Sequence, residues 1–328
     1  MKKLINQPQT VVQEMLAGIL KAYPQLVKVP HVNAVVYPHL NRQTRLISGG
    51  GSGHEPLDVG YLGPNLLDAA ILGAPFTPPT PEAIVATVEF FKIQKPVVFI
   101  IKNFIADLHN FKQAQKQLIA KGYQVGLVIV DDDRSVNPDT LNLRRRGVAG
   151  TVFVHKILGY AAEKKATLET LVSLGKAVNA NLCTLSAAFT GSELPDQQAP
   201  SFELASNEVA YGVGIHGEAG YRKEVFHSAD LLARELVNKL LQTAPLIAND
   251  HCAVLVNGLG ALPLMDQFIF AHDICELLTL KQIQPQLLKV GNFLTAYNMS
   301  GVSVTLLKLV DPDWLTALNA EVTGFAWH

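Results

Sequence analysis

Three short, continuous apolar runs constrain the fold of this 328-residue chain more than any other feature. They occupy residues 45–47, 97–101 and 125–130, and glycine-rich or polar residues follow each one at once. Runs of this kind are typical of strands that are buried on both faces of a parallel sheet. The segments 82–91 and 111–121 between them are predicted helices. This alternation predicts an α/β fold, in which ligands collect at loops beyond the carboxyl ends of the strands.

The length predicts two α/β domains, since a domain usually has about 100 to 200 residues. The segment 191–206 is polar, contains prolines and has no helical or strand period, so we place the connection there. The predicted domains are 1–190, with a glycine-rich ligand loop, and 191–328, in which the α/β alternation repeats. Further predicted elements are a helix at 11–20 after the candidate cap Asn6, a helix at 228–241, and strands at 253–256 and 302–309.

Charge and composition exclude several classes of protein. With 27 basic and 28 acidic side chains, the chain lacks the basic excess of nucleic-acid-binding proteins, so we expect no direct contact with nucleic acid. The three cysteines show no paired spacing and are predicted to be reduced core residues. Polar residues interrupt the N-terminus before a signal sequence could form, and no uncharged apolar run reaches about 18 residues. We therefore expect a cytoplasmic protein that does not enter a membrane.

Two glycine–histidine elements are the strongest candidates for a site. Gly-Val-Gly-Ile-His-Gly-Glu at 212–218 places His216 among residues without side chains, where a small ligand can approach the imidazole. Ser-Gly-Gly-Gly-Ser-Gly-His-Glu-Pro at 48–56 follows the first apolar run and ends near His54. This loop lacks the features of a P-loop or a dinucleotide fingerprint, so its amides suit either an anion or the hydroxyls of a small polyol. His54 is a candidate general acid or base, with a structural histidine as the alternative, and His216 could be incidental to a turn.

The strand at 97–101 is followed by a polar segment that adds two more candidates, Lys102 and Asp107. Asp107 can accept a hydroxyl proton or cap the next helix. We hypothesise that His54, Lys102, Asp107 and His216 converge in space.

Two charged runs are assigned to solvated turns. The three aspartates at 131–133 follow a strand, and adjacent side chains of an extended segment cannot all face one metal ion. The three arginines at 144–146 suit a phosphate or a partner protein, although a solvated face is more common. We therefore predict no metal site.

Taken together, these motifs resemble the K subunit of bacterial dihydroxyacetone kinases, a family that includes DhaQ-type coactivators. The resemblance covers essentially the whole chain. It rests on the N-terminal Met-Lys-Lys-Leu-Ile-Asn, the two glycine–histidine elements, Ile-Ile-Lys-Asn at 100–103, Arg-Arg-Gly-Val-Ala-Gly-Thr at 145–151 and Thr-Leu-Leu-Lys at 305–308.

The resemblance implies a two-domain α/β protein, usually a homodimer, that binds dihydroxyacetone covalently. It implies that His216 adds through Nε2 to the ketone carbon to form a hemiaminal, and that His54 and Asp107 bind and activate the terminal hydroxyl. The matching ligand-binding residues are Gly51, Ser52, Gly53, Lys102, Asp107 and His216. The chain itself is expected to hold no cofactor, because the family's phosphoryl donor is a separate ADP-containing L subunit that a phosphotransferase-system protein recharges.

Departures from the family pattern leave two functions open. Retained ligand residues with altered surroundings favour a DhaQ-like sensor of glycerol metabolism, which works with a TetR-family regulator and is not itself an enzyme. The alternative is the K subunit of a phosphoenolpyruvate-dependent dihydroxyacetone kinase, and retention of His54 and Asp107 is its strongest support. The departures are Thr-Pro-Pro-Thr-Pro at 77–81, Phe104, Ala106, Arg144, Ala210 and Ala219.

Overall fold

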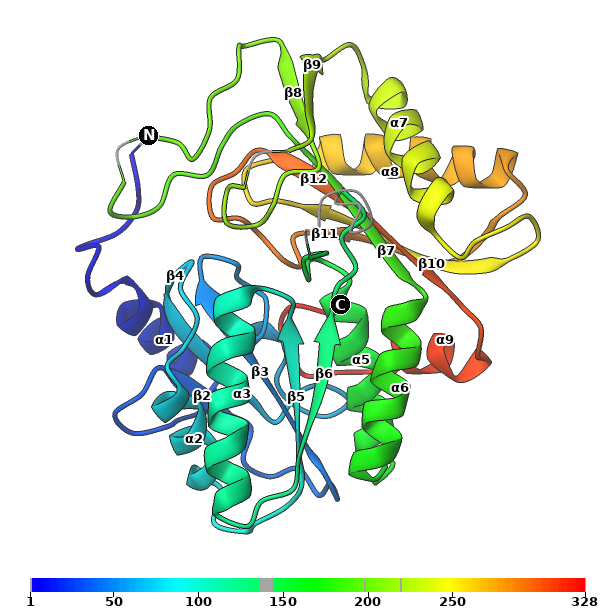
Figure 1. Ribbon diagram of the computed structural model, residues 1–328. Helices are drawn as coiled ribbons and strands as arrows, with labels where there is room; N and C mark the ends of the chain where they lie inside the picture. Colours follow the sequence, from blue (N-terminus) through cyan, green and yellow to red (C-terminus); the bar gives the residue numbers. More distant parts are fainter. Residues whose placement is uncertain (1, 136–143, 198, 219, 328) are drawn as a thin grey trace.

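The computed structural model describes residues 2–135, 144–197, 199–218 and 220–327, and these form two six-stranded sheets flanked by helices. Figure 1 shows the first sheet, with its helices on both sides, below the second sheet, whose helices α7 (Ala229–Thr243) and α8 (Leu264–Leu280) lie on the outer side. The predicted α/β class is confirmed.

The first sheet has the strand order β1-β2-β4-β3-β5-β6. Its strands are β1 (Val27–Lys28), β2 (Ala34–Val36), β3 (Arg45–Ser52), β4 (Ala69–Pro75), β5 (Val97–Lys102) and β6 (Val125–Val130). The three predicted runs are the neighbouring parallel strands β3, β5 and β6. β3 continues through the three glycines, which were predicted to form a loop. Glycine is required there because a Cβ on Gly49 would overlap the carbonyl oxygen of Ile71 in β4.

Helices cover both faces of this sheet, as the lack of polar alternation predicted. They are α1 (Val11–Ala22), α2 (Pro81–Phe90), α3 (Ile105–Ala120), α5 (Thr151–Glu163) and α6 (Leu168–Ala180). Phe99 and Ile101 pack in the core beneath α2 and α3, whereas Val98 and Ile100 pack in the core that contains α1, α5 and α6.

One predicted helix cap and one predicted helix start were wrong. The first helix begins at Val11 as predicted, but its N-cap is Thr10, and the amide of Asn6 instead donates to the Glu14 carboxylate at 2.6 Å. α3 begins at Ile105, six residues before the predicted start, because the polar residues of its first turns obscure the helical period.

The second sheet is largely antiparallel, with the order β11-β10-β12-β7-β8-β9. In chain order the predicted strand–helix alternation holds from β9 through α7, β10 and α8 to β11, and the paired strands β10 and β11 run parallel. The bounds are β7 (Leu182–Ala188), β8 (Glu208–Tyr211), β9 (Arg222–Val225), β10 (His251–Gly258), β11 (Gln284–Gly291) and β12 (Gly301–Lys308). α7 and α8 cover one face over an apolar core, in which Cys183 and Cys252 are buried; Cys275 is partly buried.

The two halves of the chain share packing. β7 precedes the predicted division after residue 190 but pairs with β8 in the second sheet. The last helix, α9 (Pro312–Asn319), packs against α5, and one core cluster contains both Ile100 of β5 and Leu255 of β10. Whether 1–190 and 191–328 are separate domains stays a prediction. Among the described residues, no helix has the length and apolarity needed to cross a membrane.

Two helical glycines give a matched test of this packing. A Cβ on Gly159 of α5 would overlap the carbonyl group of Asn65, whereas a Cβ on Gly18 of α1 meets no atom within 4 Å. Both Gly→Ala changes gain about 1 kcal/mol of helix propensity, but overpacking costs about 1–3 kcal/mol. We expect Gly18→Ala to raise the free energy of unfolding in urea and Gly159→Ala to lower it. Equal effects at the two positions would contradict the close approach of α5 to Asn65.

Candidate functional site

The glycine-rich segment follows a fixed path at the carboxyl end of β3. A Cβ on Gly51 would lie 2.6 Å from the backbone nitrogen of Thr77. Gly53 has φ +99°, where side chains are disfavoured, and a Cβ there would lie 2.9 Å from the Phe76 ring. The Ser52 hydroxyl donates to the carbonyl oxygen of Gly73 at 2.7 Å. These contacts fix the predicted ligand loop against the segment that follows β4.

His54 is buried at the end of this loop. Its Nδ1 lies 2.8 Å from the carbonyl oxygen of Thr295, and its ring stacks on Phe76 with a centroid distance of 4.8 Å. Because a carbonyl only accepts, Nδ1 carries the proton and Nε2 keeps a lone pair, with no hydrogen-bond partner among the described residues. Burial, together with the nearby His216, lowers the pKa of His54 to about 3. The ring is therefore neutral near pH 7, and its Nε2 can accept a hydrogen bond from a ligand.

Lys102 and Asp107 meet over the backbone of Gly50. A Cβ there would lie 3.0 Å from Lys102 Nζ and 3.5 Å from Asp107 Oδ1. Lys102, at the end of β5, donates to the carbonyl oxygen of Gly49 at 3.0 Å and pairs with Asp58 at 3.1 Å. Asp107 lies in the first turn of α3, whose N-cap is Phe104. Burial raises the pKa of Asp107 despite the opposing charge of Lys102, which makes it a stronger base than an exposed carboxylate.

His216 brings the second half of the chain to the same place. Its ring centroid lies 4.9 Å from that of His54 and 4.4 Å from that of Phe104, both edge to face. The side chain is 21% exposed. His54, Lys102, Asp107 and His216, which come from three separate segments of the chain, thus lie around one small region beside the glycine-rich loop.

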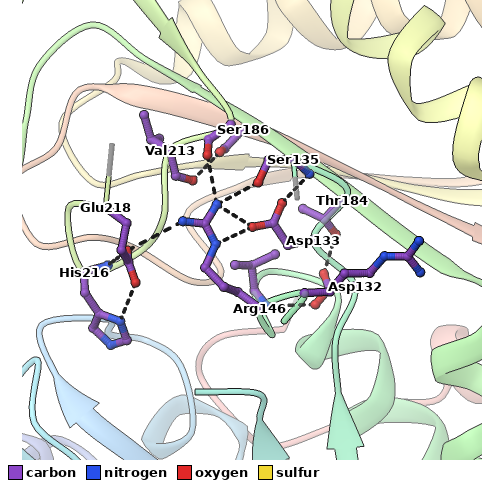
Figure 2. Close-up of polar contacts among 12 residues, drawn as sticks. Asp132, Asp133, Ser135, Arg146, Thr184, Ser186, Val213, His216 and Glu218 are labelled. Carbon is purple, nitrogen blue, oxygen red and sulfur yellow. Dashed lines mark hydrogen bonds and ion pairs between the residues drawn. The ribbon is translucent and has the colours of Figure 1, made fainter. Parts of the chain in front are cut away.

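Glu218 orients the His216 ring, as Figure 2 shows. Its Oε1 lies 3.3 Å from His216 Nδ1, and its Oε2 accepts the backbone N–H of His216 at 2.9 Å. Burial alone would raise the pKa of Glu218, but the hydrogen bond and charge of His216 and the charge of Arg146 outweigh it and lower the pKa to about 2. Glu218 is therefore a carboxylate that only accepts. Its contact favours the proton on Nδ1 and leaves the Nε2 lone pair for a ligand.

The predicted solvated turns at 131–133 and 144–146 were wrong for Asp132, Asp133 and Arg146. Asp132 is buried and accepts the backbone N–H groups of Val148 and Gly150, at 2.7 and 2.8 Å, and the Thr184 hydroxyl. Asp133 is buried against Arg146 at 2.6 Å. The carboxylates face separate partners because successive side chains of an extended segment diverge. Among the described residues, no group of three histidine, cysteine, aspartate or glutamate side chains could hold a metal ion.

Sequence reasoning missed two residues, Asp58 and Thr295, that hold the side chains of the candidate site in place. Asp58 is buried with φ +57°, holds Lys102 and lies 3.7 Å from Nε2 of the buried His155. Thr295, between β11 and β12, holds His54. No local pattern marks these residues, because their partners lie far away in the chain.

Phe104 is a departure from the family pattern whose ring packs directly on the ring of His216. Ala106 is exposed in the first turn of α3, Arg144 is exposed, and Ala210 is buried in β8. Ala219 lies outside the described residues. Phe104 thus lies beside His216 and Ala106 precedes Asp107, whereas Ala210 lies within the second sheet.

Known proteins resemble this chain over nearly its full length. Residues 17–326 match the Dak1 domain. The chain is 43% identical to the PTS-dependent dihydroxyacetone kinase, dihydroxyacetone-binding subunit DhaK, of Lactococcus lactis subsp. lactis (strain IL1403), over 99% of each chain. It is 41% identical to the DhaKLM operon coactivator DhaQ of the same strain, over 99% of this chain and 100% of that protein. The solved structure of a dihydroxyacetone kinase operon co-activator, DhaQ, superposes with a TM-score of 0.90 at 40% identity and covers 96% of this chain and 97% of that one.

Proposed function

Because this chain belongs to the Dak1 domain family, we propose that it binds dihydroxyacetone as a covalent hemiaminal at His216. The observation that carries the proposal is the contact of His216 Nδ1 with the Glu218 carboxylate, which leaves Nε2 as the nucleophilic nitrogen. Gly51, Ser52, Gly53 and Lys102 are the proposed ligand-positioning residues.

The addition is balanced in protons. The Nε2 lone pair forms a bond to the ketone carbon, and the electron pair of the C=O bond moves to oxygen. The ring then loses its Nδ1 proton, and the oxygen takes up one proton to become a hydroxyl. Glu218 stabilises the positive charge that the imidazole carries between these events.

His54 and Asp107 are proposed to bind and activate the terminal hydroxyl of the ketone. His54 Nε2 is a buried acceptor without a protein partner among the described residues, and such a group favours a ligand that donates a hydrogen bond. The raised pKa of Asp107 suits it to accept a hydroxyl proton.

We propose that the protein works as a DhaQ-like coactivator of a dihydroxyacetone kinase operon, together with a TetR-family regulator. It would act in the cytoplasm as a homodimer and report dihydroxyacetone levels in glycerol metabolism. The support is that the ligand residues are retained, while Phe104 and Ala106 differ from the kinase pattern beside the site. The alternative is the K subunit of a phosphoenolpyruvate-dependent kinase. Its support is the joint presence of His54 and Asp107, and nearly equal identity to both kinds of relative leaves it open.

Selectivity for a carbonyl group tests the proposed binding. A hemiaminal needs an electrophilic carbon, so we expect isothermal titration to show dihydroxyacetone binding at least about 100-fold more tightly than glycerol. The two ligands have similar size and hydroxyl groups, and glycerol is therefore the matched control. Equal affinities would mean that the site recognises hydroxyls alone.

A further inference from the structure

Arg146 joins the carboxyl end of the first sheet to the loop that carries His216. Its Nε donates to Asp133 Oδ2 at 2.6 Å, just beyond β6. Its Nη2 donates to the Ser135 hydroxyl at 2.8 Å and to the Gly212 carbonyl oxygen at 2.9 Å. Figure 2 shows the guanidinium between Glu218 on one side and Asp133 and Ser135 on the other. With three directed partners and only 12% of its side chain exposed, the guanidinium has a fixed position.

The remaining nitrogen of Arg146 faces the carboxylate that holds His216. Nη1 lies 4.0 Å from Glu218 Oε2, and the charge of Arg146 is one of the causes that lower the pKa of Glu218. The approach depends on the glycine at 214, because a Cβ there would overlap Glu218 Oε2 and lie 2.5 Å from Arg146 Nη1. The loop is therefore shaped to let guanidinium and carboxylate meet.

From this geometry we propose that Arg146 is a positioning residue, which fixes the proton of His216 on Nδ1 by holding the charge and orientation of Glu218. Arg146 touches no reacting atom and acts only through Glu218. The inference deepens the proposed function and rests on it where adduct formation is concerned, but the tautomer of His216 can be measured without any ketone.

The tautomer is the first test. Nitrogen-15 chemical shifts of the His216 ring in the ligand-free protein distinguish a protonated from an unprotonated Nδ1. We expect the wild type to show Nδ1 protonated and Nε2 free, Arg146→Gln to show a mixture, and Arg146→Lys to restore part of the wild-type signal because an ammonium keeps the charge. Arg144→Gln, an exposed neighbour in the same run, is the matched control and should leave the shifts unchanged. An unchanged tautomer in folded Arg146→Gln would overturn the proposal.

The second test is a double-mutant cycle on dihydroxyacetone affinity. Arg146→Gln and Glu218→Gln should each weaken binding about tenfold, since each removes one partner of a charge-assisted contact. If Arg146 acts through Glu218, the double variant should lose little more than either single variant. Fully additive losses would instead indicate that Arg146 merely supports the fold.

Arg146→Gln leaves the buried Asp133 without its cation, and the variant could therefore fail to fold. Gly214→Ala is a second variant that tests the proposal in that case. A Cβ on Gly214 would overlap Glu218 Oε2 and lie 2.5 Å from Arg146 Nη1, so this variant disturbs the contacts from Arg146 through Glu218 to His216 from the loop side. It does not remove the cation beside Asp133, and it should also give a mixed tautomer. Gly18→Ala is its control, since nothing surrounds that position. A wild-type tautomer in folded Gly214→Ala would count against the proposal. Failure of the wild type to bind dihydroxyacetone would refute the proposed function and leave the tautomer result intact.

Discussion

His216→Ala is expected to abolish the covalent adduct. With dihydroxyacetone carrying carbon-13 at the ketone, the wild-type protein should convert the carbonyl resonance into that of a carbon bonded to oxygen and nitrogen. His216 is the candidate nucleophile because its Nδ1 faces the Glu218 carboxylate, a contact that favours the tautomer with the proton on Nδ1 and the lone pair on Nε2. Alanine removes the only atom that forms the bond, so the adduct resonance should be absent at every ketone concentration.

His109→Ala is the matched control for this experiment. His109 is an exposed histidine on α3, and the same substitution there should leave the adduct resonance unchanged. Lys102 is the rival nucleophile, since it is the buried amine of the same site. An adduct that persists in His216→Ala and is trapped by borohydride would assign the bond to Lys102, because a Schiff base is reducible and a hemiaminal of imidazole is not.

Three strands of the first sheet, β3, β5 and β6, could be predicted because their signal is local. β3, β5 and β6 each carry apolar side chains to both faces, so a continuous run in the sequence is itself the strand. The second sheet could not be predicted to the same extent. β9 is exposed along its whole length and β11 is half-exposed, so neither shows an apolar run, and their pairing depends on partners from other parts of the chain.

The same contrast separates the predicted from the missed site residues. His54 and His216 stand out because glycines surround them in sequence, and those glycines are required by close packing against Phe76 and Glu218. Arg146 and Asp133 were assigned to water because a run of like charges usually is solvated. Asp133 is buried and Arg146 is mostly covered, since each supplies the countercharge of the other across a loop, which no spacing rule reveals.

Phosphoryl transfer is where the two candidate functions differ most. Mixed with a kinase L subunit, its phosphotransferase-system donor and dihydroxyacetone, this protein is expected to form no dihydroxyacetone phosphate, while the carbon-13 adduct appears in the same sample. Capture of the ketone needs His216 and its supporting groups, which are present. Transfer also needs a phosphoryl donor to approach the bound ketone, and the chain departs from the kinase pattern at Phe104 and Ala106 beside the candidate site.

A positive control and a restoring variant test this prediction. The DhaK subunit of Lactococcus lactis, 43% identical, serves as the positive control with the same L subunit and donor. A Phe104→Tyr/Ala106→Gly variant restores the family pattern beside the site and should gain measurable transfer if these two residues are the obstacle. Turnover by the wild type at an ordinary enzyme rate, on the order of 1 to 1000 per second, would identify the protein as a kinase subunit instead. Adduct without transfer is the behaviour required of a sensor, because a ligand consumed on binding could not report its own concentration.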